Sequence, residues 1–596
     1  MPCYTVNQYS VQIILSWIEA NQIAIPEIQR PFVWKSSQVR DLIDSLYRGY
    51  PVGYLIGWQS PEVRLKTGEI SSGKQILIDG QQRITALMAA ILGKKVINNR
   101  YQKTWINIAF DPIEEKFEVT NPAIKKDPRW IPNIFAILSE EAKVFDLAKE
   151  YLAKNENVDQ AEVYERIQKL RDIRNNQIGF ISLDSQLDIE EVTEIFVRIN
   201  AKGKVLSQAD FVMSKISAND SYGGSELRKL IDYFCHLVAS PEDFDAIQTT
   251  DSEFTTNSVF EKLNWLKQES NNLYNPSYTD LLRVAFVSKF RRGRLRDLVA
   301  LLSGRDFETR TYQESIIEQS FSQLKESVLD FISQTNFQRF LMILRSAGLI
   351  DPPLIGSINV VNYAYVVYLL LREAKLPAAQ IESYVRRAYV LNVLAERFSG
   401  NPEGTFDYDI RRINDQGFPN YFKYLEDAEL SSTFWEIGLP QKFNTSVASS
   451  PFYRLFLAAQ VHANDKGFLS KSITVNSMIQ LHGDRHHIYP RNYLKKLGYG
   501  QNQYNQVANY ALTQSEINIQ IGDRAPEDYF QILRGQCSGG EAKFGGITNW
   551  EELKKNLVMN CIPESMLNEK QPSYEEFLQE RRQLMAQKLK SYYESL

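Results

Sequence analysis

The sequence predicts an α+β protein of several domains, with a mixed N-terminal part, a large helical middle and a smaller C-terminal domain. At 596 residues the chain is several times the size of one compact domain. Between about residues 20 and 110, short strand-like runs alternate with helical stretches. From about residue 136 to 435, apolar residues recur three and four positions apart, as in helices that bury one face.

The composition is that of an ordinary globular chain, with 43% hydrophobic and 23% charged residues, so we expect it to fold throughout. The net charge of −4 gives no overall attraction to polyanions, and any nucleic-acid contact must therefore come from local basic patches. The four cysteines form no C-x-x-C pair, which favours a reducing compartment. Since the start has no basic leader and the longest apolar run, 363–371, is too short to span a membrane, we expect a cytoplasmic protein.

The expected elements of the N-terminal part are a helix over 37–48 and strands over 54–56, 75–78 and 105–108. Apolar residues at helical spacing predict a further helix over 189–199.

Further along, Gly-, Pro- and Asn-rich stretches at 399–404 and 444–451 are the best linker candidates. Ser573 and Glu576 form a capping box that predicts the last helix. We therefore divide the chain into domains at 1–215, 216–440 and 441–596.

A D-G-Q-Q-R sequence follows the expected strand at 75–78 and precedes apolar residues at helical spacing, which places Asp79 and Gly80 at a strand-to-helix turn. The helix start would expose backbone N–H groups to an anion, and Arg83 adds a cation suited to phosphate oxygens. Asp79 would hold a metal-bound water or orient Arg83, while Gln81 and Gln82 would position a nucleophile or read a base. The same residues also fit an ordinary turn with an ion pair.

Spaced motifs on both sides of D-G-Q-Q-R carry a family resemblance. They are Q-R-x-x-x-W from Gln29, G-x-P-x-G from Gly49 and F-x-R-x-N-x-x-G-x-x-L from Phe196. With D-G-Q-Q-R, they resemble the N-terminal domain of the GmrSD-type restriction enzymes over about residues 5 to 215. That family is related to the ParB and sulfiredoxin fold. The resemblance implies binding and hydrolysis of a nucleoside triphosphate with Mg²⁺, through Gln29, Arg30, Asp79, Gly80, Gln81, Gln82, Arg83, Arg198 and Asn200.

The last of these motifs also has a purely structural interpretation. Asn200 would end one helix, Gly203 would supply a positive φ, and Ser207 with Asp210 would cap the next helix. We favour this interpretation for Gly203 and Ser207, and leave both open for Arg198 and Asn200.

Four of the five histidines, His462, His482, His486 and His487, lie close together in sequence. A metal nuclease needs imidazoles or carboxylates to hold a cation and a base to accept a proton from water. Neighbouring strand residues face opposite sides, so a bulge is implied if both His486 and His487 point inward. We interpret His462 and the remaining His236 as structural.

The run H-H-I-Y-P, followed by two spaced asparagines, resembles the ββα-metal, HNH-type nuclease domain that closes GmrSD-like proteins. The resemblance implies that His487 is the general base, His486 and Asn518 are ligands of Mg²⁺ or Mn²⁺, and Asn509 positions the loop of the base. Asp484 and His482 are alternative ligands, and Arg485 and Arg491 are candidate phosphate contacts.

The densest basic cluster is K-F-R-R-G-R-L-R from Lys289 to Arg296, which is either a solvated face or a phosphate-binding groove. The leading hypothesis is a nucleotide-regulated endonuclease that cuts double-stranded DNA, specifically modified phage DNA. The alternatives are a nucleotide-switched DNA sensor without cleavage and a sulfiredoxin-like enzyme, for which Cys3 is the one cysteine near the phosphate site in sequence. The sequence leaves open the nucleotide, among GTP, ATP, UTP and CTP, and whether the chain forms a homodimer.

Overall fold

The computed structural model describes residues 3–20, 22–24, 34–59, 63–64, 70–71, 75–98, 102–139, 141–155, 158–187, 191–192, 195, 207–269, 273–481 and 483–596. It divides into two compact units. Unit 1 contains Met1–Ser270, Ser277–Leu282 and Arg294–Val328, and unit 2 contains Asn271–Pro276, Arg283–Gly293 and Leu329–Leu596. Each unit joins part of the expected helical middle to one end of the chain, and the expected division into three domains stays a prediction.

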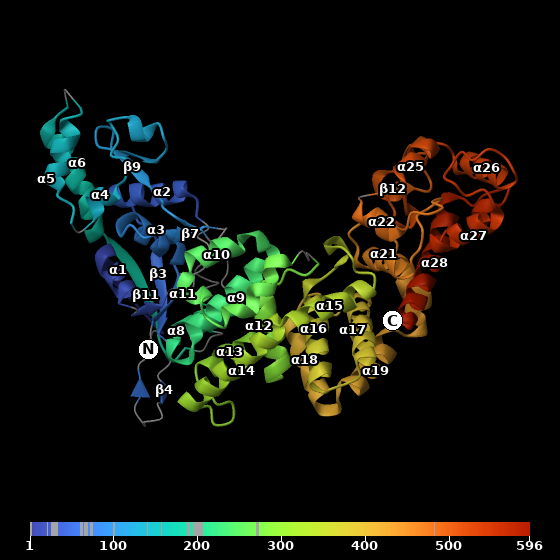
Figure 1. Ribbon diagram of the computed structural model, residues 1–596, viewed down its shortest axis with the longest axis horizontal. Coiled ribbons are helices and arrows are strands. Elements are labelled where there is room, and N and C mark those ends of the chain that lie inside the picture. Colours follow the sequence, from blue (N-terminus) through green and yellow to red (C-terminus); the bar gives the residue numbers. More distant parts are fainter. Residues whose placement is uncertain are drawn as a thin grey trace. The chain divides into compact units, whose positions relative to one another are not determined.

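A five-stranded mixed sheet organises unit 1 (Figure 1). The order is β1 (Tyr4–Ser10), β11 (Gln177–Leu183), β3 (Tyr54–Gln59), β6 (Gln75–Asp79) and β2 (Ile23–Ala24). β11 pairs in parallel with β3 and β2 with β6, whereas the β1–β11 and β3–β6 pairs are antiparallel. The predicted α+β class is therefore confirmed for this part of the chain.

Helices pack on this sheet because their apolar residues form one face. Among them are α1 (Val11–Glu19), α2 (Ser36–Tyr47) and α3 (Gln81–Ile91), whose buried side chains share a core with Leu55 and Leu77 of the sheet. The expected helix over 37–48 and the strands over 54–56 and 75–78 are confirmed. The expected helix over 189–199 falls mostly outside the described residues.

The strand expected at 105–108 is displaced. Strand β9 covers Ile108–Asp111 and pairs with β10 (Lys116–Val119), while β8 covers Lys103–Thr104 and pairs with β7 (Val96–Ile97). Trp105 lies between strands and is 54% exposed, and its ring lies 5.1 Å from the ammonium of Lys95. A short pair, β4 (Val63–Arg64) and β5 (Ile70–Ser71), completes the described strands of unit 1.

The remaining elements of unit 1 are mainly helical. They are η1 (Ile124–Lys126), α4 (Phe135–Leu138), α5 (Val144–Leu152), α6 (Gln160–Asp172), η2 (Ile173–Asn175), α8 (Gln208–Ala218), η3 (Asp220–Tyr222), α9 (Gly224–Ala239), η4 (Pro241–Asp243), α10 (Phe244–Thr250), α11 (Ser252–Thr255), η5 (Phe260–Gln268), α12 (Tyr278–Phe290), α13 (Leu295–Leu302) and α14 (Glu314–Ile332). Two of the boundaries between the units fall within α12 and α14.

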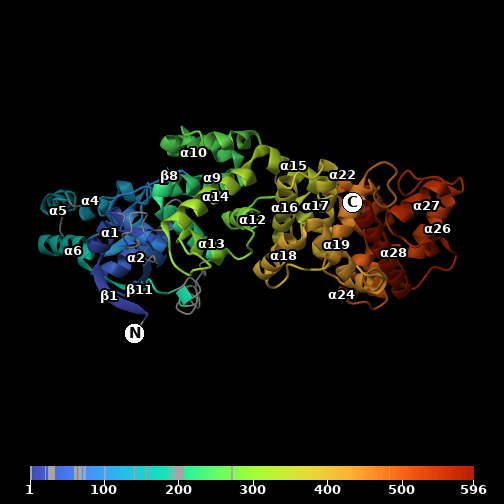
Figure 2. The same ribbon diagram turned by 90° about the horizontal axis from the view of Figure 1, so that it is seen from below.

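Unit 2 begins with a helical bundle in which α16 and α17 lie side by side (Figure 2). Most residues of α16 are buried, because its sequence is apolar around most of its circumference. Along the described chain, no helix is both long and apolar enough to cross a membrane. The bundle comprises α15 (Gln334–Ser346), η6 (Pro352–Leu354), α16 (Ile358–Glu373), α17 (Ala378–Leu394), α18 (Pro402–Gln416), α19 (Phe418–Glu429), the π-helical turn Phe434–Gly438 and α20 (Leu439–Lys442).

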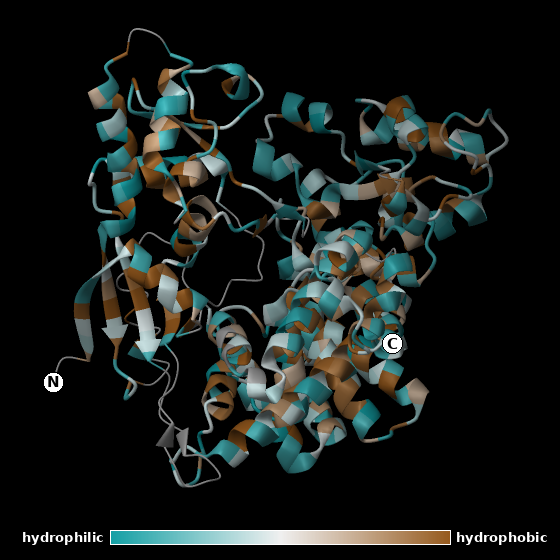
Figure 3. Cartoon of the chain, turned by 60° about the vertical axis from the view of Figure 1, so that its left-hand side comes forward, coloured by the Kyte–Doolittle hydropathy of each residue, from teal (hydrophilic) through white to brown (hydrophobic). Residues whose placement is uncertain are grey.

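The rest of unit 2 contains a two-stranded sheet and is otherwise mainly helical. Figure 3 shows hydrophobic and hydrophilic residues mixed along the helices of the chain. The predicted capping box is confirmed, since the Ser573 hydroxyl and the Glu576 carboxylate cap the start of α28. The elements are α21 (Pro451–His462), α22 (Val475–Gln480), β12 (Asp484–His487), α23 (Arg491–Lys496), α24 (Gln501–Tyr504), η8 (Val507–Asn509), β13 (Tyr510–Thr513), α25 (Ser515–Ile521), α26 (Pro526–Cys537), α27 (Trp550–Met559), η9 (Glu564–Leu567) and α28 (Tyr574–Ser595).

Helix α8 buries a lysine in unit 1. Lys215 is 3% exposed, and its ammonium lies 5.5 Å from the centre of the Trp58 ring. Burial lowers the pKa of Lys215 from 10.5 to about 7. Above that pH the folded chain releases a proton that the unfolded chain keeps up to pH 10.5.

We therefore expect the free energy of unfolding to rise with pH between about 7 and 10, because the unfolded state binds more protons in this window. Lys215→Met should make this dependence flatter and stabilise the protein at the low end of the window. Urea unfolding across the window measures both effects, with the exposed Lys149→Met as the control. Equal pH slopes in the wild type and Lys215→Met would contradict the prediction.

Candidate functional site

The D-G-Q-Q-R sequence forms the predicted strand-to-helix turn. Strand β6 ends at Asp79, Gly80 has φ of 97°, and α3 begins at Gln81. A Cβ atom on Gly80 would lie 2.2 Å from Cδ2 of Leu55, so both the backbone conformation and the space require glycine here.

Arg83 joins this turn to the G-x-P-x-G motif. Its Nη1 donates a hydrogen bond to the carbonyl oxygen of Tyr54 at 2.9 Å. Gly53 has a positive φ, and a Cβ there would come within 3.1 Å of Nη2 of Arg83. Burial lowers the pKa of Arg83, and the nearby carboxylate of Asp79 opposes this shift. The structure therefore brings two of the predicted motifs together.

The two glutamines of the motif have different environments. Gln81 is 6% exposed, and its Nε2 donates to the carbonyl oxygen of Leu77 at 3.0 Å, so this side chain ties the helix to the strand. Gln82 is half-buried. The other predicted nucleotide contacts, Gln29, Arg30, Arg198 and Asn200, lie outside the described residues.

Ser207 and Asp210 cap α8 as the structural interpretation predicts. The carboxylate of Asp210 accepts hydrogen bonds from the backbone N–H and the hydroxyl of Ser207, and the Ser207 oxygen accepts from the N–H of Asp210. Gly203 lies outside the described residues.

The histidine pair lies on β12, which is antiparallel to β13 and is followed by α25. His486 is 3% exposed and stacks on Phe468, with 5.6 Å between ring centres. Its Nδ1–H donates to Oδ1 of Asn518 at 2.8 Å. Nδ2 of Asn518 in turn donates to the Asp484 carboxylate at 3.3 Å. Two predicted metal ligands and one predicted alternative therefore form one cluster.

The chemistry of this cluster fits a small divalent cation. Asp484 and Asn518 present oxygen atoms, which Mg²⁺ or Mn²⁺ accepts. Because Nδ1 of His486 carries the hydrogen donated to Asn518, its lone pair is on Nε2, a buried atom with no hydrogen-bond partner among the described residues. Burial lowers the pKa of His486 to about 4, so its imidazole is neutral at physiological pH, as a metal ligand must be. Within the described ranges, no three His, Cys, Asp or Glu side chains form a metal-binding group, and the cluster depends on the amide of Asn518. His482 lies outside these ranges.

His487 is not part of this cluster. Its Nε2–H donates to Oδ1 of Asn505 at 3.0 Å, and its ring packs edge-on against Tyr510. All four residues of β12 pair in continuous register with β13, so the bulge that we expected is absent and the two histidines face opposite sides. Burial lowers the pKa of His487. Sequence reasoning missed Asn505, whose only signal was its place in an Asn- and Gln-rich loop.

Asn509 holds the chain just after the histidines. It is fully buried; its Oδ1 accepts from the N–H of Tyr489, and its Nδ2 donates to the carbonyl oxygens of Tyr489 and Tyr504. Arg581 of α28 is also fully buried and donates to the carbonyl oxygens on either side of Asn509, those of Ala508 and Tyr510, both at 2.7 Å. Asn509 therefore fixes the backbone at Tyr489, and its role in positioning the base stays a prediction.

The other candidates have structural partners. Nδ1 of His462 bonds to the carbonyl oxygen of Ser346, and Nε2 of His236 lies 2.8 Å from the Asp243 carboxylate. In the basic cluster, Arg291 pairs with Glu373.

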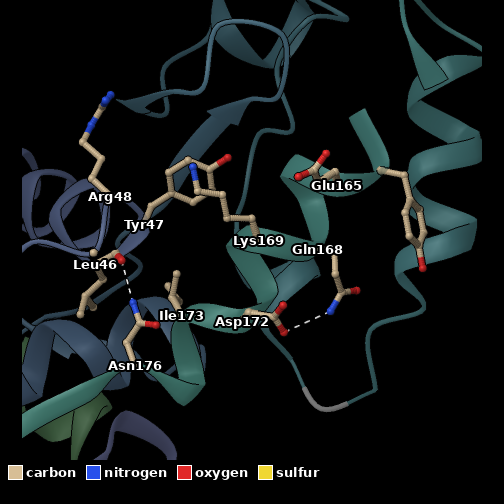
Figure 4. A pocket seen from close by; sticks show the side chains of 11 residues that line it. Leu46, Tyr47, Arg48, Glu165, Gln168, Lys169, Asp172, Ile173 and Asn176 are labelled. Atoms are coloured by element: carbon tan, nitrogen blue, oxygen red, sulfur yellow. Dashed lines mark hydrogen bonds between the residues drawn. The ribbon is translucent and has the colours of Figure 1, made fainter. Parts of the chain in front are cut away.

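A large pocket of about 620 Å³ lies between α2 and α6 (Figure 4). Its walls include Gly49 of the G-x-P-x-G turn, but none of the predicted catalytic residues. Lys169 pairs with Glu115 and covers the ring of Tyr47, while Arg48 pairs with Asp44. Because these cations already have partners, we do not place the chemistry here.

Gly80→Ala should destabilise unit 1 more than Gly223→Ala does. Both glycines have a left-handed φ, but only at Gly80 would a Cβ meet another side chain within 4 Å. The conformation alone costs about 1 to 2 kcal/mol, and overpacking against Leu55 should add about 1 to 3 kcal/mol. Urea unfolding of both variants measures the difference, and equal losses of unfolding free energy would show that Leu55 gives way freely.

Comparison with known proteins identifies one segment of the chain. Residues 13–217 match the family described as GmrSD restriction endonuclease, N-terminal domain. A search of curated proteins gave no match. The matched segment contains four of the five strands of the unit 1 sheet, all but β1, together with the D-G-Q-Q-R turn and the G-x-P-x-G turn that meets it. Over residues 13–217 the chain is therefore similar to the N-terminal domain of the GmrSD restriction endonuclease family.

Proposed function

We propose that this protein is a nucleotide-regulated, metal-dependent DNA endonuclease that acts against foreign, modified phage DNA. The family match indicates a restriction role in defence. The observation that carries the nuclease proposal is the Asp484, His486 and Asn518 cluster, built on two antiparallel strands and the helix that follows them. This arrangement supports the HNH-like interpretation of the C-terminal domain.

The cluster would hold Mg²⁺ or Mn²⁺ through Asp484, His486 and Asn518. A bound cation there supplies Lewis acidity toward a phosphate oxygen and lowers the pKa of water. The neutral His486 and the oxygen atoms of its neighbours would hold that cation beside the strand pair.

His487 would accept the proton of the attacking water. Since Asn505 accepts the hydrogen of Nε2, the lone pair of the imidazole is on Nδ1, and this atom would take the proton. Oxygen of water then bonds to phosphorus, and the bond from phosphorus to the leaving sugar oxygen breaks. That oxygen keeps the electron pair of the bond and takes a proton from solvent. The lowered pKa of His487 keeps the ring neutral and able to act as a base at neutral pH.

In the N-terminal domain, the D-G-Q-Q-R turn would bind and hydrolyse a nucleoside triphosphate. Asp79 and Arg83 lie at the start of α3, where backbone N–H groups and the helix dipole favour phosphate. The guanidinium of Arg83 is held toward the Gly53 turn by the carbonyl of Tyr54, and phosphate would compete for the same donors.

One observation favours a second function, a nucleotide-switched DNA sensor without cleavage. His487 faces away from the His486 and Asn518 cluster, whereas hydrolysis needs a base and a cation at one phosphate. Substrate binding would have to bring the two faces of β12 to the same phosphate for cutting to occur.

His487→Ala should lower DNA cleavage by about 100- to 10,000-fold, because the variant lacks the base but keeps the metal cluster. Nicking and linearisation of modified and unmodified phage DNA measure this, with each nucleoside triphosphate and Mg²⁺ or Mn²⁺ present. EDTA should stop wild-type cleavage, and added metal should restore it. His236→Ala, which changes a histidine of unit 1, is the control. Wild-type cleavage by His487→Ala would remove the base assignment, and DNA binding without cleavage by the wild type would favour the sensor.

Asp79→Ala or Arg83→Ala should abolish nucleoside triphosphate hydrolysis, since each lacks a charge at the phosphate-facing end of α3. The metal cluster lies in unit 2 and should stay assembled. Phosphate release and plasmid nicking, measured on the same preparations, separate hydrolysis from its coupling to cleavage. Arg171→Ala, on α6 of the same unit, is the matched control. Unchanged phosphate release in both variants would mean that D-G-Q-Q-R is only a turn.

A further inference from the structure

A pocket of about 440 Å³ lies in unit 2, next to the histidine strand. It is formed by the chain around η6, the start of α21, the end of α22 and the two strands β12 and β13. Its volume is in the range of small-molecule and cofactor sites, about 300 to 1,000 Å³. Its lining includes two arginines, Arg454 and Arg485, and the apolar residues Leu354, Leu457, Met478 and Leu512.

Two arginines give this pocket its charge. Arg485 is exposed; its guanidinium lies 5.2 Å from the centre of the Tyr510 ring, and among the described residues no carboxylate pairs with it. Arg454 donates to the carbonyl oxygen of Ile355 at 3.0 Å and likewise has no carboxylate partner in the described ranges. The pocket wall also contains one acidic side chain, Asp351. The two guanidinium groups can therefore bind an anionic group such as a phosphate by donating hydrogen bonds to it.

Much of the rest of the lining is apolar. It includes Leu354, Leu457, Met478 and Leu512, and Leu512 pairs with Arg485 across the strands. Such a surface suits the flat face of a nucleobase, which loses little on leaving water. A pocket that combines two cations with an apolar wall has the chemistry of a nucleotide site.

The pocket is on the same side of β12 as His487. Arg485 and His487 are two residues apart on a regular strand, so their side chains point to one face. The ring of Tyr510 contacts both, with its centre 5.0 Å from that of His487. A group held by Arg485 therefore lies along the strand from the imidazole.

We propose that this pocket binds one nucleotide of the DNA strand, with its phosphate at Arg454 and Arg485 and its base against Leu354, Leu457 and Met478. The inference rests on the proposed nuclease function and names how the strand is held beside His487. Binding at this point would fix the position of the strand relative to the imidazole, and would be independent of base sequence at the phosphate.

A free nucleotide presents the same phosphate and base, so the test must separate the two sources. DNA binding is measured in the His487→Ala background, which prevents cutting, and binding of the free nucleoside triphosphates is measured in parallel. Arg485→Gln lacks one cation, and Ser449→Trp fills the pocket from an exposed wall position without a change of charge. Arg339→Gln, on α15 of the same unit, is the matched control for charge.

We expect Arg485→Gln to weaken DNA binding and to reduce the slope of log affinity against log salt by about 1. Ser449→Trp should weaken binding about 5- to 150-fold, as expected for loss of the contact of one base. With His487 restored, both variants should raise KM for DNA more than they lower kcat. The control Arg339→Gln should leave both the DNA affinity and the KM for DNA unchanged.

Unchanged DNA affinity in Ser449→Trp would overturn the inference, because the base would then not enter the pocket. Both variants could instead lose binding of the free nucleoside triphosphate and keep DNA binding. That result would assign the pocket to the free nucleotide and overturn the inference. If the wild type cuts DNA and the pocket variants cut it with unchanged KM, the nuclease proposal stands and this inference fails. If the wild type neither binds nor cuts DNA, both fail.

Discussion

The guanidinium of Arg581 is fully buried in unit 2, and three backbone carbonyl oxygens, those of Ala508, Tyr510 and Asn560, accept its hydrogen bonds. Burial lowers its pKa to about 10. A buried cation without these acceptors would cost several kcal/mol, so the chain around Asn509 must keep its carbonyls in place. Asn509 in turn holds the backbone of Tyr489 through two hydrogen bonds, and this fixes the position of the end of β12. The geometry of the candidate centre thus depends on one side chain of the last helix.

The alternation of side chains along β12 divides the chemistry between two faces. His486 turns toward Asn518 and Asp484, where burial keeps it neutral, and His487 turns toward Asn505. Arg485 and the proposed nucleotide pocket lie on the face of His487. β12 would therefore separate the cation site from the general base His487. A DNA chain that reaches both would have to pass over the edge of β12. The choice between the nuclease and sensor hypotheses therefore depends on whether DNA can reach both faces of β12.

In unit 1, the important constraint is the close approach of two backbone turns. Gly53 and Gly80 let the G-x-P-x-G turn and the start of α3 meet around Arg83, whose donors would otherwise be blocked by a Cβ. The burial of Arg83 costs hydration of its charge, and an anionic ligand would recover part of that cost. An anionic ligand would likewise interact favourably with the pocket of unit 2. Two arginines that have no carboxylate partner among the described residues line this pocket, although the whole chain has a net charge of −4.

The sequence by itself determined the elements whose signals are local. The helix at α2, the strand-to-helix turn at Gly80 and the capping boxes at Ser207 and Ser573 depend on neighbours within a few residues, and they appear as predicted. Motif order also predicted the family domain that residues 13–217 match. Only the tertiary structure decided that Gln81 turns inward, that Asn505 partners His487, and that Arg454 and Arg485 line one pocket. These facts depend on packing and strand register between residues far apart in sequence, and local periodicity carries no information about either.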